Sequence, residues 1–135
     1  MPIEWTQDLA TGIEEIDAQH RELYAAIANL HDAMRYGELA RAAVVLHFLD
    51  RYVRDHFSLE ERWMASVKYP RFKEHAELHR TFVADFLLRR EQFDASGPRA
   101  SLVVDLADWL GGWLRDHIRR VDVEMGKFIR AAARR

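Results

Sequence analysis

The sequence predicts an all-α fold: an antiparallel, up-down-up-down four-helix bundle with a non-helical N-terminal segment and a short helical tail at the C-terminus. Two observations predict it. Apolar residues recur at steps of three and four in four separate stretches, which is the period of an α-helix. Glycine and proline, which interrupt helices, number only 6 and 3. Short loops between stretches of about 17–25 residues favour antiparallel neighbours.

The segment before the first helix contains three large apolar residues, so we expect it to lie across the bundle. These residues are Trp5, Leu9 and Ile13. The first helical pattern runs from Ile16 to Met34, with Asp17 as a candidate N-cap and Gly37 as a candidate stop. Because no repeat, linker or change of composition follows, residues 1–135 are predicted to form one domain.

Three more helical patterns follow, at 46–63, 72–86 and 102–117. Pro70 suits the first turn of the third helix. The residues after Asp122 predict the short helical tail. A lone antiparallel bundle of this length can bury its own core, so we expect a monomer.

Composition excludes several classes of protein. The formal net charge is −2, which argues against a nucleic-acid partner. There is no cysteine, so disulfides, thiolate zinc sites and iron–sulfur clusters are excluded. No apolar run approaches the roughly 20 residues that span a bilayer, and the N-terminus lacks the apolar core of a secretory signal. We therefore expect a cytoplasmic protein without a membrane contact.

Polar residues interrupt the apolar faces of all four predicted helices. They are His20, His56, Glu60, His75, His79 and His117. A buried polar group without a partner costs roughly 1–3 kcal/mol, so six of them require a shared partner. His56 and Glu60 are four residues apart, as are His75 and His79, so each pair can direct two ligands to one point on the bundle axis.

Asp122 adds a seventh candidate ligand, five residues after His117. On an ideal helix this spacing is a rotation of about 140°, so the two side chains would not share a face. If both bind one site, the helix must be distorted between them, and we predict an irregular turn at 118–121.

Three further polar residues are predicted to lie outside the site. His31 is on the face of His20 but about 16 Å farther along the helix. His47 lies about half a turn off the face of His56 and is expected to face solvent. Glu61 points about 100° away from Glu60 and is expected to be a surface charge.

The candidate ligands are five imidazoles and two carboxylates. This set is too rich in nitrogen for calcium or magnesium, it lacks the thiolate of copper electron-transfer sites, and it exceeds one tetrahedral zinc. Two metals bridged by both carboxylates and by one solvent-derived oxygen fit better. Three histidines (His75, His79, His117) then give one metal six ligands, and two (His20, His56) give the other five. One coordination position then stays open, which suits a small diatomic molecule, and iron is the redox metal that accepts these ligands.

The same residues resemble the bacterial hemerythrins. The similarity rests on Asp17-Ala18-Gln19-His20, His56-Phe57-Ser58-Leu59-Glu60-Glu61, Met64, His75-Ala76-Glu77-Leu78-His79 and His117-Ile118 followed by Asp122, and it extends from residue 5 to about 128. The resemblance implies two iron ions in an oxo- or hydroxo-bridged non-haem centre that binds O2 reversibly. It also implies an apolar O2 pocket at Leu23, Phe57, Trp113 and Ile118, which would exclude water and protons.

Four functions are compatible with this sequence. The first is oxygen storage, delivery or scavenging by a protein that is not an enzyme. The second is an oxygen or redox sensor that signals to a partner. The third is a di-iron enzyme such as a peroxidase or nitric oxide reductase, although the Glu-x-x-His pairs of oxidase-type bundles are absent. The fourth is a bundle that holds zinc or no metal. A protein that accepts oxygen or electrons stays open as a partner.

Overall fold

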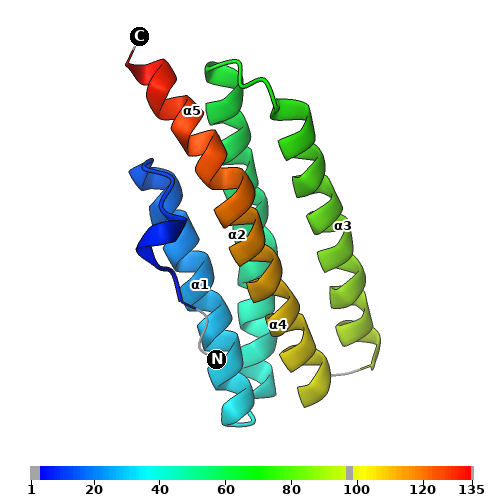
Figure 1. The fold of residues 1–135 in the computed structure, drawn as a ribbon. Helices are drawn as coiled ribbons and strands as arrows, with labels where there is room; N and C mark the ends of the chain where they lie inside the picture. The colour runs from blue at the N-terminus through cyan, green and yellow to red at the C-terminus, as the bar shows by residue number, and fades with distance from the viewer. Residues whose placement is uncertain (1–3, 97–98, 135) are drawn as a thin grey trace.

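The computed structural model describes residues 4–96 and 99–134, and it confirms the four-helix bundle. The long helices are α1 (Glu14–Arg35), α2 (Leu39–Ser66), α3 (Phe72–Ser96) and α4 (Ala100–His117). A π-helical turn, η2 (Ile118–Asp122), joins α4 to the tail helix α5 (Val123–Ala133), and a 3-10 turn, η1 (Gln7–Leu9), precedes α1. The four long helices lie side by side, and α5 continues the direction of α4 (Figure 1).

The start of α1 differs from the prediction. The helix begins at Glu14 with Ile13 at the N-cap, so Asp17 is not the N-cap. The Asp17 carboxylate instead accepts hydrogen bonds from Thr11 N (2.8 Å), Thr11 Oγ1 (2.7 Å) and Gly12 N (3.2 Å). Asp17 therefore fastens the N-terminal segment to the first turn of the helix, because each of these donors lies ahead of α1.

The ends of α1 and α2 use the same backbone device. Gly37 stops α1 as predicted, with a φ of 67°, and Glu38 N donates to Ala33 O at 2.7 Å. Lys68 takes the corresponding left-handed position after α2, with a φ of 54°. Pro70 lies in the turn before α3 rather than in its first turn, because α3 begins at Phe72.

The N-terminal segment lies across the bundle, as expected. It is not wholly irregular, because η1 forms one short turn with Leu9 fully buried. Asp8 Oδ2 accepts a hydrogen bond from Arg119 Nη2 at 2.8 Å. The backbone of Thr11 approaches Gly126 of α5 so closely that a Cβ there would lie 2.3 Å from Thr11 O. The segment thereby connects α1 with η2 and α5.

Two apolar clusters form the core. The larger includes Leu23 of α1, Phe57 of α2 and Ile118 of η2. The smaller includes Ile16 of α1 and Met125 of α5. A polar layer lies between the two clusters along the chain direction of these helices. In the described part of the chain, no helix is long and apolar enough to cross a membrane.

Candidate metal centre

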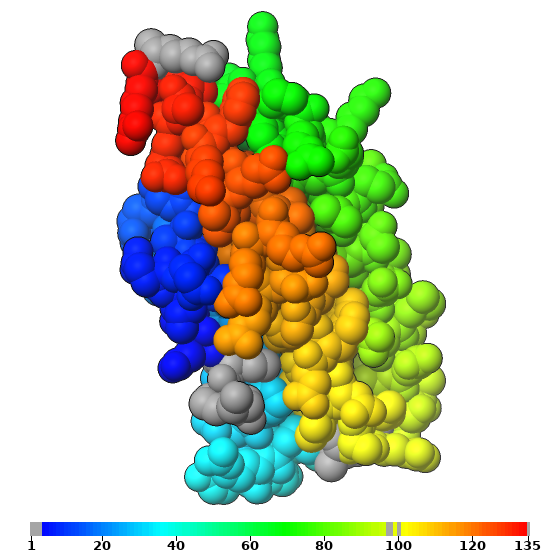
Figure 2. Space-filling model, in the orientation of Figure 1, coloured from blue at the N-terminus to red at the C-terminus, as the bar shows by residue number. Residues whose placement is uncertain are grey.

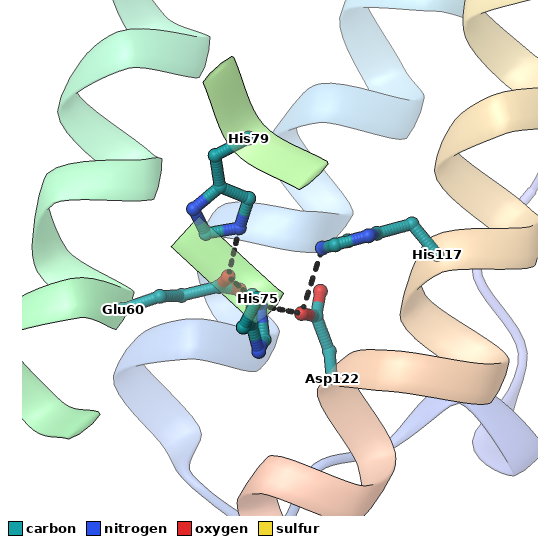
Figure 3. Close-up of side chains that lie close together, drawn as sticks. All are labelled: Glu60, His75, His79, His117 and Asp122. Atoms are coloured by element: carbon teal, nitrogen blue, oxygen red, sulfur yellow. Dashed lines mark ion pairs between the residues drawn. The ribbon is translucent and has the colours of Figure 1, made fainter. Parts of the chain in front are cut away.

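The polar layer contains all seven predicted ligands, which come from every long helix. They are His20 on α1, His56 and Glu60 on α2, His75 and His79 on α3, His117 at the end of α4 and Asp122 at the end of η2. Each residue is 5% exposed or less. Figure 3 shows five of them with their imidazole and carboxylate groups directed toward one another. The four helices therefore bring the seven side chains into one buried site.

The π-helical turn confirms the irregular turn predicted at 118–121. In a π-helix the hydrogen bonds run from residue i to i+5, so the turn accommodates one more residue than a regular α-helix. This widening places Asp122 beside His117, with Oδ1 3.1 Å from His117 Nε2. The unusual spacing of five residues is therefore compatible with one site.

One oxygen of each carboxylate faces a set of three histidines. Glu60 Oε1 lies 3.1 Å from His79 Nε2 and 3.3 Å from His75 Nε2. Asp122 Oδ1 lies 3.0 Å from His75 Nε2 and 3.1 Å from His117 Nε2. These five residues form a group whose ligand atoms all lie within 4.8 Å of one another.

The second oxygen of each carboxylate faces the other two histidines. Glu60 Oε2 lies 2.9 Å from His56 Nε2 and 3.2 Å from His20 Nε2, and Asp122 Oδ2 lies 3.1 Å from His20 Nε2. These four residues form a second group of the same compactness. Both carboxylates thus belong to both groups, in the three-plus-two arrangement that the coordination count predicts.

Hydrogen bonding alone does not satisfy the cluster. Within the described residues, several of its buried atoms lack a hydrogen-bond partner, although nitrogen and oxygen lie close together. Those that face the centre of the cluster are Nε2 of His56, His75, His79 and His117, Oε1 of Glu60 and both oxygens of Asp122. Lone pairs that converge without aligned hydrogens fit a cation between them, because such a cation is the partner that these atoms lack. Imidazole and carboxylate together suit iron.

Without a cation, protons balance the charge of the cluster. Burial alone would lower the pKa of His20, but the facing carboxylates of Asp122 and Glu60 outweigh it and raise the pKa to about 9. Burial would also lower the pKa of His75, but the same two carboxylates raise it to about 9. Burial would raise the pKa of Glu60 and of Asp122, but the histidines hold both pKa values well below the usual range.

Two of the histidines have a second polar partner on the ring nitrogen that faces away from the cluster. His56 Nδ1 lies 2.7 Å from Gln19 Oε1, and His79 Nδ1 lies 2.9 Å from Glu61 Oε2. The prediction that Glu61 is a surface charge is therefore wrong, because its side chain is only 34% exposed and contacts His79. Such partners fix the orientation and tautomer of a metal-binding imidazole.

Sequence reasoning missed Gln19 because its spacing to His56 carries no signal. Gln19 and His56 are 37 positions apart, on two helices joined by a loop, and helical periodicity relates only residues on one helix. The rotation of about 100° from Glu60 indicated only that Glu61 points away from the bundle axis. It did not indicate that α3 packs on that side and brings His79 to the Glu61 carboxylate. The signal available in the sequence was that a second acid directly follows a ligand.

His31 and His47, the two histidines predicted to lie outside the site, do lie outside the cluster. His47 is exposed. His31 is half-buried, with Nε2 3.6 Å from Asp108 Oδ1 of α4. Neither belongs to the two groups of converging ligand atoms.

The four predicted pocket residues lie against the histidines and form what we call the apolar wall: Leu23, Phe57, Trp113 and Ile118. The Phe57 ring stacks on His79 with centroids 3.8 Å apart, and Trp113 stacks on His117 at 4.4 Å. Leu23, Phe57 and Ile118 are buried in the larger core cluster, and Trp113 packs against that cluster. This side of the cluster is therefore shielded by carbon atoms.

Known proteins share this arrangement. The family model described as the hemerythrin HHE cation binding domain matches residues 11–129. A bacteriohemerythrin of Pseudomonas aeruginosa is 35% identical over 118 residues, which cover 87% of this chain and 75% of the relative. A hemerythrin-like protein of Naegleria gruberi is 30% identical over 123 residues, 91% of this chain and 90% of the relative.

Solved structures agree with these relatives. The crystal structure of a hemerythrin mutant superposes with a TM-score of 0.80 at 26% identity, and it covers 96% of this chain and 98% of that chain. A second solved structure, a leucine-to-phenylalanine mutant, gives a TM-score of 0.85 at the same identity and coverage. A bundle of this topology, a family model over most of its length and relatives above 30% identity together place this chain in the hemerythrin family.

Proposed function

We propose that this chain binds O2 reversibly at a di-iron centre, for storage, delivery or scavenging, and that it is not an enzyme. The observation that carries the proposal is the division of the two carboxylates. Each gives one oxygen to a set of three imidazoles and the other oxygen to a set of two. Two metal ions bridged by two carboxylates account for this division, and a single ion does not.

The proposed ligands are the seven residues of the cluster. His75, His79 and His117 would hold one iron, His20 and His56 would hold the other, and Glu60 and Asp122 would bridge the pair. When bound, iron supplies reversible electron transfer to O2 and an open position for it on the side with two histidines. The family membership supports iron, because relatives of this chain bear the name bacteriohemerythrin.

The apolar wall would keep the bound gas away from water. Leu23, Phe57 and Ile118 are 4% exposed or less, so a small apolar molecule beside the histidines would contact carbon rather than solvent. Water and protons promote the irreversible loss of reduced oxygen species, so their exclusion favours release of O2 unchanged. We propose this wall as the O2 pocket.

An optical spectrum tests the proposal directly. Iron is added to the protein, the sample is reduced without oxygen, and spectra are taken before air, after air and after oxygen is removed again. We expect two irons per chain and a visible charge-transfer band that forms in air and disappears on deoxygenation. A protein that oxidises at once and needs a reductant to recover would favour the sensor or the di-iron enzyme. A site that binds zinc and takes up no iron would contradict the oxygen-binding, sensor and di-iron enzyme functions alike.

Other sequence predictions belong to the same proposal. We propose that residues 1–135 form a single di-iron domain, of which the family model spans 11–129. A monomeric state and a cytoplasmic location stay predictions. Gel filtration of the iron-loaded protein would decide the oligomeric state.

A further inference from the structure

A cleft of about 480 Å³ lies between α3 and the continuous α4–η2–α5 helix. On the face drawn in Figure 2, α3 (green) borders this helix (yellow to red). The deep end of the cleft contains two of the proposed ligands, His75 and His117. Its rim carries charged side chains from both helices, and Leu78, which is 41% exposed, lies on its lining. The cleft therefore leads from solvent to the histidines.

His75 at the deep end differs from His56 and His79 in the surroundings of its outer ring nitrogen. His56 and His79 have Gln19 and Glu61 as partners for the outer ring nitrogen. The Nδ1 atom of His75 is buried and has no hydrogen-bond partner among the described residues, although metal-binding histidines nearly always have one. His20 Nδ1 is likewise buried without a partner among the described residues, but of the two histidines only His75 lines the cleft.

A hydrated divalent cation meets a high free-energy barrier at the apolar wall, which borders the cleft at Trp113. Leu23, Phe57 and Ile118 of this wall are buried, and transferring an ion from water into an apolar environment costs far more free energy than transferring a neutral polar group. The cleft instead presents oxygen ligands to an incoming ion. Divalent cations of this size prefer carboxylate oxygens and water before they meet imidazole.

Three carboxylates stand at the rim: Glu74 and Asp116, whose side chains are more than two-thirds exposed, and Glu124, which is about half exposed. Arg71 pairs with Glu124 at 3.0 Å and with Glu74 at 3.5 Å, and Arg120 pairs with Asp116 at 3.4 Å. Exposed pairs of this kind contribute little free energy. An incoming cation can therefore displace the arginines, and the carboxylates exceed them by one.

We propose that this cleft is the entry route for iron(II), with the rim carboxylates as transient ligands and His75 and His117 as the first permanent ones. The proposal rests on the proposed function, because it requires that the cluster holds iron. It assigns a role to Glu74, Asp116 and Glu124, which are not among the seven proposed ligands.

A positive charge inside the cleft tests the route. Leu78→Arg is compared with Leu88→Arg, which places the same charge on an exposed position of α3 about 15 Å farther along the helix. Circular dichroism first establishes that each full-length, metal-free chain is folded. Iron(II) uptake is then followed without oxygen by mixing with ferrous salt and sampling the free iron. We expect Leu78→Arg to load roughly tenfold more slowly than Leu88→Arg, since repulsion lowers the rate at which an ion is captured.

A second test removes negative charge from the rim instead of adding positive charge to the cleft. The double variant Glu74→Gln, Asp116→Asn is compared with Asp105→Asn, an exposed position on α4 eleven residues before Asp116. We expect slower uptake in the double variant only, with a difference that shrinks as salt is added, because salt screens the attraction of exposed charges. The same pairs are compared for removal of iron from the loaded protein by a chelator, which does not depend on a folded metal-free chain.

The final iron content separates this proposal from the proposed function. Slow uptake by Leu78→Arg and by the double variant, with two irons per chain at the end, supports the entry route. Equal rates in test and control variants, for both uptake and removal, overturn it and leave the iron site intact. A chain that binds no iron at any rate overturns both proposals.

Discussion

Glu60 and Asp122 differ from the five histidines because each contributes to both halves of the site. Each histidine belongs to one of the two groups of ligand atoms, so its removal affects that group alone. Each carboxylate belongs to both groups. The carboxylates also hold the protons of His20 and His75 in the absence of metal. At the scale of single residues, Glu60 and Asp122 are the two members of the cluster that belong to both groups of converging ligand atoms among the described residues, so the proposed pair of metals depends on them.

Replacing Glu60 or Asp122 by alanine is expected to abolish binding of both irons. The bridging oxygens disappear, and the remaining imidazoles face each other without a negative charge to offset the metal. Iron per chain is measured by elemental analysis after reconstitution. His47→Ala and His31→Ala are the controls and should retain the iron content of the unmodified protein. Loss of iron from the His47 variant would contradict the ligand assignment.

Glu61→Gln is expected to weaken iron binding about 10- to 100-fold, as is typical when the outer partner of a metal-binding histidine is changed. The amide keeps the size of the side chain but removes the negative charge beside His79 Nδ1. Competition with a chelator of known affinity measures the change. Glu77→Gln, at an exposed position on α3, is the matched control. Equal affinities in the two variants would show that Glu61 does not act on the metal.

Six of the seven ligands could be predicted from the sequence because each lies on the apolar face of a helix whose period is readable. Polar residues on that face are rare enough to stand out, and the spacing of His56 to Glu60 relates residues on one helix. Asp122, about 140° from His117 on an ideal helix, required an irregular turn. Gln19 and Glu61 could not be predicted, since their partners lie on other helices. The rotation of one helix against its neighbour depends on how side chains pack, which a single sequence does not reveal.

At the scale of elements, the junctions of the last helix position the site. The π-helical turn aligns Asp122 with His117, and the N-terminal segment packs against the helix that follows this turn. The need for an irregular turn followed from the spacing of two proposed ligands. The contact of the N-terminal segment with Gly126 did not, because nothing in a short irregular segment indicates which helix it will meet. Asp17 was misassigned for a related reason, since its partners in that segment depend on how the segment folds back.

Gly126→Ala is expected to destabilise the protein by about 1–3 kcal/mol, because its new methyl group would meet the backbone of Thr11. The contact involves the backbone of Thr11, so the methyl group fits only if α5 or the N-terminal segment shifts. Gly112→Ala is the control: no atom lies within 4 Å of its Cβ position, and alanine favours the interior of a helix by roughly 1 kcal/mol. Denaturant unfolding measures both. The interpretation fails if the two substitutions shift stability in the same direction.

At the scale of the whole molecule, the metal site connects all four helices. The ligands come from every long helix, so a metal that binds only the folded chain would stabilise the bundle by an amount that grows with the ratio of free metal to its Kd. Helices α3 and α4 contact each other less extensively than α1 contacts α2 or α4, and less than α2 contacts α3. Aromatic contacts join these two helices, since the Phe82 ring of α3 stacks on Trp109 of α4 and lies 4.2 Å from Trp113 between ring centroids, and a bound metal would add to them.

The stability of the metal-free and loaded proteins should diverge as pH rises. The pKa of His20 and of His75 is raised from 6.5 to about 9, so their protonated forms stabilise the metal-free chain below about pH 6.5, and this contribution is lost toward pH 9. Metal binds the deprotonated imidazoles, so its affinity increases over the same interval. We expect the gap between the two melting temperatures to widen from pH 6.5 to 9, and calorimetry in buffers of different ionisation enthalpy to record proton release on metal binding. A gap that stays constant or narrows would mean that these histidines carry no proton for the metal to displace.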